Sequence, residues 1–328
     1  MADFTARELP AELVAAMSPE AVAAGLPHLL ANIFMGCRVI GASLRSCSFS
    51  SDVAGSTNDF GDNQLDVDLK TDAVLFDALR ASGLVEVASS EEVPTAVPCG
   101  GSGYCVAFDP LDGSSVVDAN FAVGTILGVW PGPSLLNRTG REQCASLVVM
   151  YGPRVTAALA LNTTATADGR AISMELTMHE EGWVVSVPRF QIAPQGRVFA
   201  PGNLRATKDN AGYKRLVDFW IDSQYTLRYS GGLVPDIYHI LIKGKGVLSN
   251  VASPSTKAKL RLLYECAPIA LIIESAGGSS CVSPSEVGES LAPVSLLDVP
   301  VTTLDRRVGV CYGSTEEVER FKEYLFST

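Results

Sequence analysis

A short acidic motif in the middle of the chain restricts its fold and its chemistry more than any other feature. Asp109-Pro110-Leu111-Asp112-Gly113 follows the apolar run Tyr104-Cys105-Val106-Ala107-Phe108. The run predicts a buried strand, so the two carboxylates are expected at the edge of a sheet. Carboxylates and a turn carbonyl at Leu111 are the hard oxygen ligands that Mg²⁺ prefers. A plain acidic turn is the alternative, since Asp, Pro and Gly are all common in turns.

The composition describes a globular and acidic protein. The 328 residues are 47% hydrophobic and 19% charged, which is enough for two packed lobes, with a boundary expected near residue 198. The net charge of −11 argues against nucleic acid or an anionic membrane as a partner. No run of about 18 apolar residues occurs, so no membrane-spanning segment is expected.

The first residues do not resemble a targeting peptide, because Asp3, Glu8 and Glu12 are acidic and the segment is not rich in Ser and Arg. This favours a cytoplasmic protein. The alternative is a plastid protein that has lost its transit peptide.

Apolar patterning predicts strands and helices in both halves of the chain. A helical segment ends near Arg45, a polar loop covers 48–59, and a short strand or turn leads into a helix over 64–81. Strands are expected over 104–108, 124–130, 145–151, 155–161, 183–187 and 225–229, and helices over 211–223, 235–243 and 259–276. Interleaved strands and helices fit an α/β architecture.

Other carboxylates accompany apolar segments. Glu91 and Glu92 follow the run 85–88, and adjacent strand residues point to opposite faces, so different roles are expected for them. Glu265 lies in an apolar segment, where an isolated carboxylate is costly, so it needs either a metal ion or a salt bridge to a nearby Lys or Arg. The acidic residues upstream fit a solvated loop as well as catalysis; they are Asp62, Asp66, Asp68 and Asp72.

The order of these motifs resembles the fructose-1,6-bisphosphatase family, a group of Mg²⁺-dependent sugar and inositol phosphatases. The matching segments run from Gly61 to the end of the chain: Gly61-Asp62, Ser90-Glu91-Glu92, Asp109-Pro110-Leu111-Asp112-Gly113-Ser114-Ser115, Arg228-Tyr229-Ser230-Gly231-Gly232 and Lys259-Leu260-Arg261-Leu262-Leu263-Tyr264-Glu265. Segments 199–207, 229–236 and 253–259 and the turn 128–132 are most similar to the sedoheptulose-1,7-bisphosphatase branch.

The resemblance implies a layered α-β-α-β-α fold, with a metal- and scissile-phosphate-binding lobe over 1–198 and a sugar- and distal-phosphate-binding lobe over 199–328. It implies hydrolysis of the 1-phosphate of sedoheptulose 1,7-bisphosphate; a fructose-1,6-bisphosphatase or a dual-specificity enzyme is the alternative. A homodimer or homotetramer is also implied. A sugar-phosphate or metal sensor on an inactive scaffold is the non-enzymatic alternative.

The resemblance also assigns roles to single residues. The implied metal ligands, for Mg²⁺ or alternatively Mn²⁺, are Glu91, Asp109, the Leu111 carbonyl, Asp112 and Glu265. The residues implied to bind metal or to activate the attacking water are Asp62, Asp68 and Glu92. The residues implied to hold the substrate are Gly113, Ser114 and Ser115 at the scissile phosphate, and Asn203, Arg228, Tyr229, Gly231 and Lys259 at the sugar and distal phosphate.

The sequence departs from the family in three places. Ala206 and Ser249 stand where fructose enzymes typically have aromatic residues, so room for a longer sugar is expected. Ser51 and Ser56 stand where plastid relatives have a cysteine pair, so no thioredoxin control is expected. The Gly-Thr-Gly-Glu-Leu string of the nucleotide-inhibitor site is missing, so no inhibition by AMP is expected.

Overall fold

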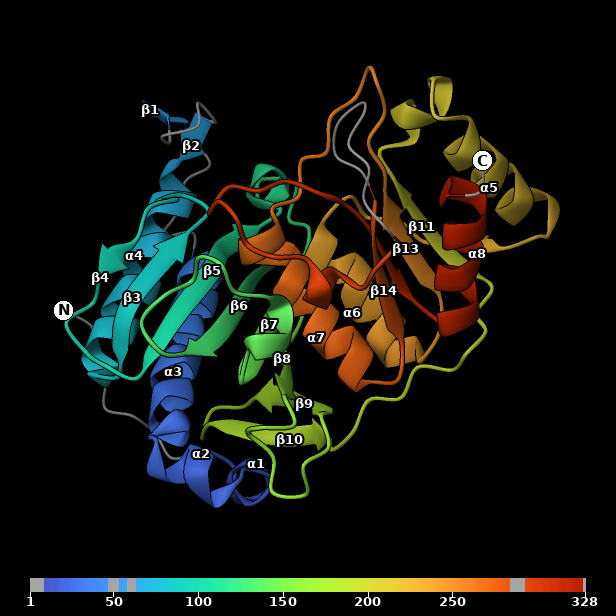
Figure 1. Cartoon of the computed structure of the whole chain (residues 1–328). Helices are drawn as coiled ribbons and strands as arrows, with labels where there is room; N and C mark the ends of the chain where they lie inside the picture. Colours follow the sequence, from blue (N-terminus) through green and yellow to red (C-terminus); the bar gives the residue numbers. More distant parts are fainter. Residues whose placement is uncertain (1–8, 47–52, 58–62, 284–292, 327–328) are drawn as a thin grey trace.

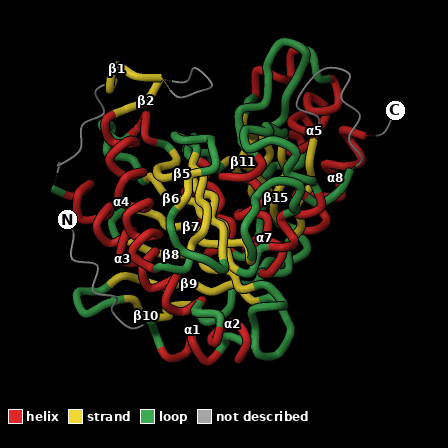
Figure 2. The backbone as a smooth tube through the Cα atoms, turned by 60° about the vertical axis from the view of Figure 1, so that its left-hand side comes forward, coloured by secondary structure: helices red, strands yellow, loops and turns green. Residues whose placement is uncertain are grey.

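The computed structural model describes residues 9–46, 53–57, 63–283 and 293–326. Two main β-sheets alternate with three layers of helices, so the expected α-β-α-β-α architecture is confirmed (Figure 1). The two sheets splay apart toward one end of the molecule, as the tube in Figure 2 shows. No helix within the described ranges is long and apolar enough to cross a membrane.

The larger sheet has eight strands in the order β10-β9-β8-β7-β6-β5-β3-β4. Its strands are β3 (Val85–Ser90), β4 (Val97–Pro98), β5 (Tyr104–Asp112), β6 (Val123–Pro131), β7 (Ala145–Tyr151), β8 (Val155–Leu161), β9 (Ile172–Met178) and β10 (Trp183–Val187). The pair β3–β5 is parallel and the other neighbours are antiparallel. Because parallel strands end at the same edge, the residues that follow β3 lie beside the end of β5.

The outer face of this sheet is covered by α3 (Leu26–Arg45) and α4 (Asp66–Ser82), with the short helices α1 (Ala11–Ala15) and α2 (Pro19–Ala23) nearby (Figure 1). Leu26, Leu29, Leu30, Ile33 and Phe34 of α3 are buried, as their helical spacing predicts.

The middle layer is formed by α6 (Leu233–Lys243) and α7 (Ala267–Ser275), which contact both sheets. Helix α6 packs very close to β6, since a Cβ atom built on Gly124 would lie 2.4 Å from Cγ1 of Val234. A glycine is therefore required at this crossing.

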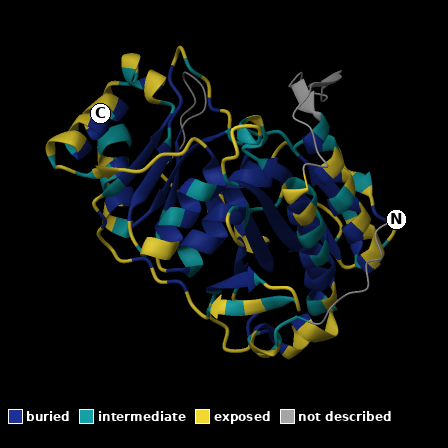
Figure 3. Cartoon of the chain, turned by 180° about the vertical axis from the view of Figure 1, so that it is seen from behind, coloured by how far each residue is buried: buried dark blue, intermediate teal, exposed yellow. Residues whose placement is uncertain are grey.

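The second sheet has the order β12-β11-β13-β15-β14. Its elements are β11 (Val198–Gly202), β12 (Thr226–Leu227), β13 (Val247–Asn250), β14 (Ser279–Ser283) and β15 (Gly309–Gly313), with α5 (Ala211–Asp222) and α8 (Thr315–Phe326) on the outer side. Figure 3 shows buried residues in the strands and exposed ones on the outer helices. Trp130 and Trp220 are core residues of the two halves.

Two features of local structure differ from expectation. The loop expected over 48–59 contains β1 (Val53–Thr57), which pairs with β2 (Asn63–Leu65). Strand β9 was not expected at all. The helix expected over 259–276 is confirmed from Leu262 onward: the π-helical turn Leu262–Cys266 continues directly into α7, where Pro268 stands in the first turn and needs no N–H partner.

The chain passes from the large sheet to the second sheet between β10 and β11. The lobe boundary near residue 198 stays a prediction, because α6 and α7 from the C-terminal half cover a face of the large sheet.

Candidate active site

Three carboxylates from three separate elements converge at one edge of the large sheet. Glu91 follows β3, Asp109 lies near the end of β5, and Glu265 lies in the turn that precedes α7. One oxygen from each lies within 4.8 Å of the other two. The backbone N–H of Glu91 also donates to the Phe108 carbonyl at 3.0 Å, which continues the β3–β5 pairing up to the cluster. We call Glu91, Asp109 and Glu265 the acidic cluster.

A β-bulge directs the two aspartates of the central motif. Asp109 pairs with Ile126 and Asp112 pairs with Gly124, so Pro110 and Leu111 together oppose the single residue Thr125. In a regular strand, residues three apart point to opposite faces. The extra residue shifts this alternation, which brings Asp112 to the same face of the sheet as Asp109 of the acidic cluster.

Each aspartate also accepts a backbone hydrogen bond. Oδ1 of Asp109 accepts from the N–H of Leu111 at 2.9 Å, and Oδ2 of Asp112 accepts from the N–H of Val234 at 2.7 Å. The second bond ties the motif to the first turn of α6. Gly113 then has a φ of +82°, a left-handed conformation that favours glycine and turns the chain into Ser114 and Ser115.

Crowding and burial make ionisation of these acids unfavourable. Burial raises the pKa of Asp109 and Glu265 well above their usual values, and the neighbouring carboxylates raise them further. Burial raises the pKa of Asp112 to about 7, although the Val234 hydrogen bond lowers it. A bound cation would favour the ionised carboxylates.

The basic residue that precedes Glu265 forms salt bridges with neighbouring carboxylates. The guanidinium of Arg261 pairs with Glu91, and its Nε donates to Oδ1 of Asp305 at 2.7 Å. Glu265 instead accepts the backbone N–H of Arg261 at 2.6 Å. Arg261 was not expected to be a site residue, although its position four residues before Glu265 is visible in the sequence.

The donor set fits a hard divalent cation. Asp109 and Glu265 are 4% and 5% exposed, so their oxygens have little access to bulk water. Buried carboxylate oxygens held this close together repel one another unless a positive charge compensates them. Glu91, Asp109 and Glu265 would hold the ion. Asp112 and the Leu111 carbonyl stay predicted ligands.

The structure describes only some of the residues that are predicted to activate water. Asp62 lies outside the described residues. Asp68 is buried in the first turn of α4, and Glu92 is half-buried beside Glu91. Burial raises the pKa of Asp72, one turn after Asp68, to about 6. The hydrogen bond with the Ser90 hydroxyl opposes this rise but does not cancel it. The catalytic roles of Asp62, Asp68 and Glu92 stay predictions.

The predicted distal-phosphate residues lie at one edge of the second sheet. Strands β11, β12 and β13 are parallel and end together, so Asn203 and Arg228 follow neighbouring strand ends. Arg228 and Tyr229 are exposed, as is Lys259. The loop from Arg228 to Gly232 is fixed by Asp236, which accepts the N–H groups of Ser230 and Gly231 at 2.8 and 3.3 Å. Nothing in the sequence patterning had singled out Asp236.

The two positions at which this chain has smaller side chains than the fructose enzymes do not line open space. Ala206 and Ser249 are each 0% exposed. The Tyr213 hydroxyl lies 3.3 Å from that of Ser249 and donates to the Gly202 carbonyl at 2.6 Å. The expectation that these small side chains make room for a longer sugar is therefore not met in this structure.

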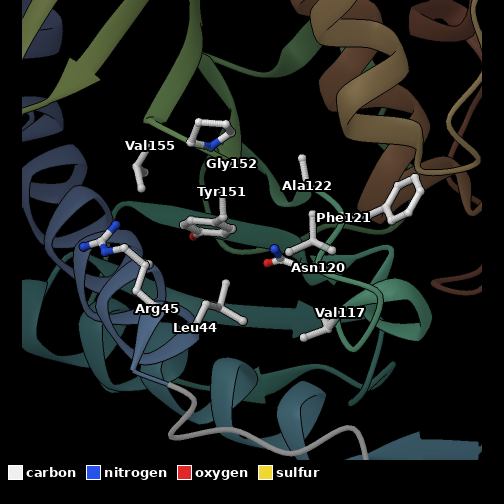
Figure 4. A pocket seen from close by; sticks show the side chains of 12 residues that line it. Leu44, Arg45, Val117, Asn120, Phe121, Ala122, Tyr151, Gly152 and Val155 are labelled. Atoms are coloured by element: carbon white, nitrogen blue, oxygen red, sulfur yellow. The ribbon is translucent and has the colours of Figure 1, made fainter.

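A separate cavity of about 290 Å³ lies between the end of α3 and the β7–β8 turn (Figure 4). Arg45, Asn120 and Tyr151 line it together with apolar side chains. None of the described site residues named above lines this cavity.

The cysteines offer no disulfide within the described residues. All seven described cysteines are free and buried. Cys47 and Ser51 lie outside the described residues, and the side chain of Ser56 is not described.

Comparisons with known proteins agree with this geometry. The family models described as fructose-1-6-bisphosphatase N-terminal and C-terminal domains match residues 12–171 and 192–326. The chloroplastic sedoheptulose-1,7-bisphosphatase of Chlamydomonas reinhardtii is 48% identical over 304 residues, which are 92% of this chain and 74% of that protein. The class 1 fructose-1,6-bisphosphatase of Citrifermentans bemidjiense is 36% identical and covers 92% and 87%.

Solved structures share the fold. A candidate sedoheptulose-1,7-bisphosphatase from Toxoplasma gondii superposes with a TM-score of 0.85 at 36% identity and covers 98% of both chains. The fructose-1,6-bisphosphatase of Leishmania major in its holo form, with a TM-score of 0.82 at 24% identity over 98% of this chain and 100% of that one, shows the fold alone. By sequence and by architecture, the chain belongs to the fructose-1,6-bisphosphatase family.

Proposed function

We propose that the protein is a Mg²⁺-dependent phosphoric monoester hydrolase that converts sedoheptulose 1,7-bisphosphate and water into sedoheptulose 7-phosphate and phosphate. The observation that carries this proposal is the convergence of Glu91, Asp109 and Glu265 at one edge of the large sheet. The similarity to sedoheptulose-1,7-bisphosphatases supports the choice of substrate.

The role proposed for each group of residues follows from its charge. Glu91, Asp109 and Glu265 would hold a divalent cation, which would supply charge neutralisation of the phosphate oxygens, acidification of a water molecule and stabilisation of the departing alkoxide. The backbone of Gly113 and the hydroxyls of Ser114 and Ser115 would hold the scissile phosphate. Asp68 and Glu92, with Asp62, would orient the attacking water and accept its proton.

The distal phosphate is only bound, so cationic and hydrogen-bonding groups suit it. Arg228 and Lys259 would supply positive charge, while Asn203, Tyr229 and Gly231 would contact the sugar and phosphate. Asp236 would keep the loop that carries Arg228 in place.

The second candidate is a fructose-1,6-bisphosphatase or an enzyme that accepts both substrates, and the 36% identity to a class 1 fructose enzyme favours keeping it. A homodimer or homotetramer, a cytoplasmic rather than a plastid location, and the absence of thioredoxin and AMP control stay predictions.

Phosphate release from both bisphosphates, measured with Mg²⁺ and with EDTA, tests the proposal. We expect turnover only with the metal, and a higher kcat/KM for the seven-carbon substrate. Asp112→Asn should abolish turnover, whereas Asp77→Asn on the exposed face of α4 should not. Turnover in EDTA would contradict the proposed chemistry, and a strong preference for the six-carbon substrate would favour the second candidate.

A further inference from the structure

The β-bulge in β5 holds a backbone carbonyl that accepts a hydrogen bond from a side chain. Pro110 has no N–H group, and it lies with Leu111 opposite Thr125 instead of in a one-to-one pair. Pro110 is a buried residue, so its carbonyl needs a hydrogen-bond donor. The donor is the Oγ1 hydroxyl of Thr125, at 2.8 Å.

Thr125 is in turn held by Tyr151. Its Oγ1 lies 2.9 Å from the Tyr151 hydroxyl. A threonine hydroxyl has one hydrogen, which is used for Pro110, so Tyr151 must donate to Thr125. Thr125 and Tyr151 are 0% and 6% exposed, and the Cys37 thiol also lies beside the Tyr151 hydroxyl.

The resulting chain of donors ends between the two aspartates of the motif. Tyr151, from the end of β7, donates to Thr125 of β6, and Thr125 donates to Pro110 of β5. Pro110 directly follows Asp109 and precedes Asp112 by two residues. The path begins at the wall of the cavity in Figure 4, where Tyr151 is labelled.

We propose that Thr125, supported by Tyr151, is a positioning residue that fixes the bulge and thereby orients Asp109 and Asp112 for the divalent cation. This inference rests on the metal site of the proposed function. Without the Thr125 hydroxyl, the Pro110 carbonyl would lose its buried partner and the bulge could relax toward a regular register. Asp109 and Asp112 would then tend to point to opposite faces of the sheet.

Three variants of the full chain test the proposal. Thr125→Val keeps the shape of the side chain and removes the hydroxyl. Thr125→Ser keeps the hydroxyl. Thr177→Val is the matched control, because Thr177 is a buried threonine of the same sheet whose Oγ1 lies 2.9 Å from Ser186 Oγ, far along the strand order from the motif.

The readout is Mn²⁺ binding without substrate, followed by electron paramagnetic resonance of the free ion. Loss of a residue that orients metal ligands typically weakens metal affinity by about 10- to 100-fold, so we expect roughly 10-fold weaker binding for Thr125→Val. Thr125→Ser and Thr177→Val should stay within about twofold of the wild type, since neither removes the donor to Pro110. Thermal melting of each variant shows whether it is folded.

Wild-type affinity in a folded Thr125→Val variant would overturn the inference and leave the proposed function intact. A loss in Thr177→Val as large as that in Thr125→Val would also overturn it. If Thr125→Val does not fold, Tyr151→Phe carries the test: weaker Mn²⁺ binding supports the inference, and unchanged binding overturns it. Failure of the wild type to bind Mn²⁺ would overturn the metal site itself.

Discussion

Nη1 of Arg261 donates to Oε1 of Glu91, while the backbone N–H of the same arginine donates to Oε2 of Glu265. One residue therefore touches two of the three carboxylates of the acidic cluster, and its side chain is only 5% exposed. The protein supplies one positive charge to the cluster itself. The three carboxylates and the nearby Asp112 can carry more negative charge than one arginine balances. A divalent cation would balance the remainder.

Arg261→Gln is expected to destabilise the metal-free protein more than the metal-bound one. Removing one partner of a buried ion pair costs on the order of 3–5 kcal/mol, because the remaining carboxylates are left uncompensated. Mg²⁺ should recover part of this loss by replacing the missing charge. Urea unfolding in EDTA and in Mg²⁺ measures both values.

The control for this variant is Arg141→Gln. Arg141 is 50% exposed and pairs with Asp298 at the surface, so its loss should cost at most about 1 kcal/mol in either condition. An equal cost of Arg261→Gln with and without Mg²⁺ would contradict the idea that the arginine and the metal share the same carboxylates.

The metal-free protein is expected to lose stability as the pH rises. Burial raises the pKa of Asp112 from 3.8 to about 7, and it raises those of Asp109 and Glu265 as well. The folded state therefore binds more protons than the unfolded state in this range. The contribution of these three carboxyl groups to folding stability is fully present below their pKa in the unfolded state. It is lost as the pH rises through their pKa in the folded state.

Thermal melting in EDTA between pH 4 and 8 should show this decline, because that window spans the pKa values of Asp112 in the unfolded and the folded state. Saturating Mg²⁺ should reverse the trend above neutral pH, because the cation binds the ionised carboxylates. Asp112→Asn should flatten the EDTA profile. A profile in EDTA that rises with pH would contradict the arrangement of the acidic cluster.

Much of this architecture could be predicted from the sequence because strand and turn signals are local. Strands β7, β8 and β10 have the predicted bounds, since each is an apolar run between turn residues. Strand β9 carried a usable signal that was missed, namely the alternation of apolar and polar residues over Ile172–Met178.

The contacts inside the site could not be predicted in this way. Glu91 and Arg261 are 170 residues apart, and only the packing of α7 against the large sheet brings them together. The same is true of Asp112 and Val234, which lie 122 residues apart. Residue types indicated a cation site and a basic residue near Glu265, but the pairing of Arg261 with Glu91 and the contact of Thr125 with Pro110 emerge only from tertiary structure.

Ser249→Tyr is expected to destabilise the fold without converting the substrate preference. Ser249 is fully buried against Tyr213, so a larger ring has no space and overpacking typically costs about 1–3 kcal/mol. Urea unfolding and kcat/KM for both bisphosphates would measure the two effects. Ser249→Ala is the control and should change little. A stable Ser249→Tyr variant that prefers the six-carbon substrate would restore the view that this position selects sugar length.

Asp236→Ala is expected to raise KM for the bisphosphate. The Asp236 carboxylate is 6% exposed and holds the N–H groups of Ser230 and Gly231, so its loss frees the loop that carries Arg228. Misplacing a binding group by about 1 Å can cost up to ~100-fold, and we expect about 10-fold in KM. The Mg²⁺ concentration for half-maximal activity should change less, because Asp236 is not a member of the acidic cluster.

Two further variants separate positioning from stability. Asp236→Asn keeps a carbonyl acceptor for one of the two N–H groups, so it should recover part of the lost affinity. Asp222→Ala, at the exposed end of α5, should leave KM unchanged. A lower melting temperature for Asp236→Ala with an unchanged KM would mean that this carboxylate stabilises α6 without placing the loop. A higher KM that Asp236→Asn partly restores would mean that the carboxylate sets the position of the distal-phosphate residues.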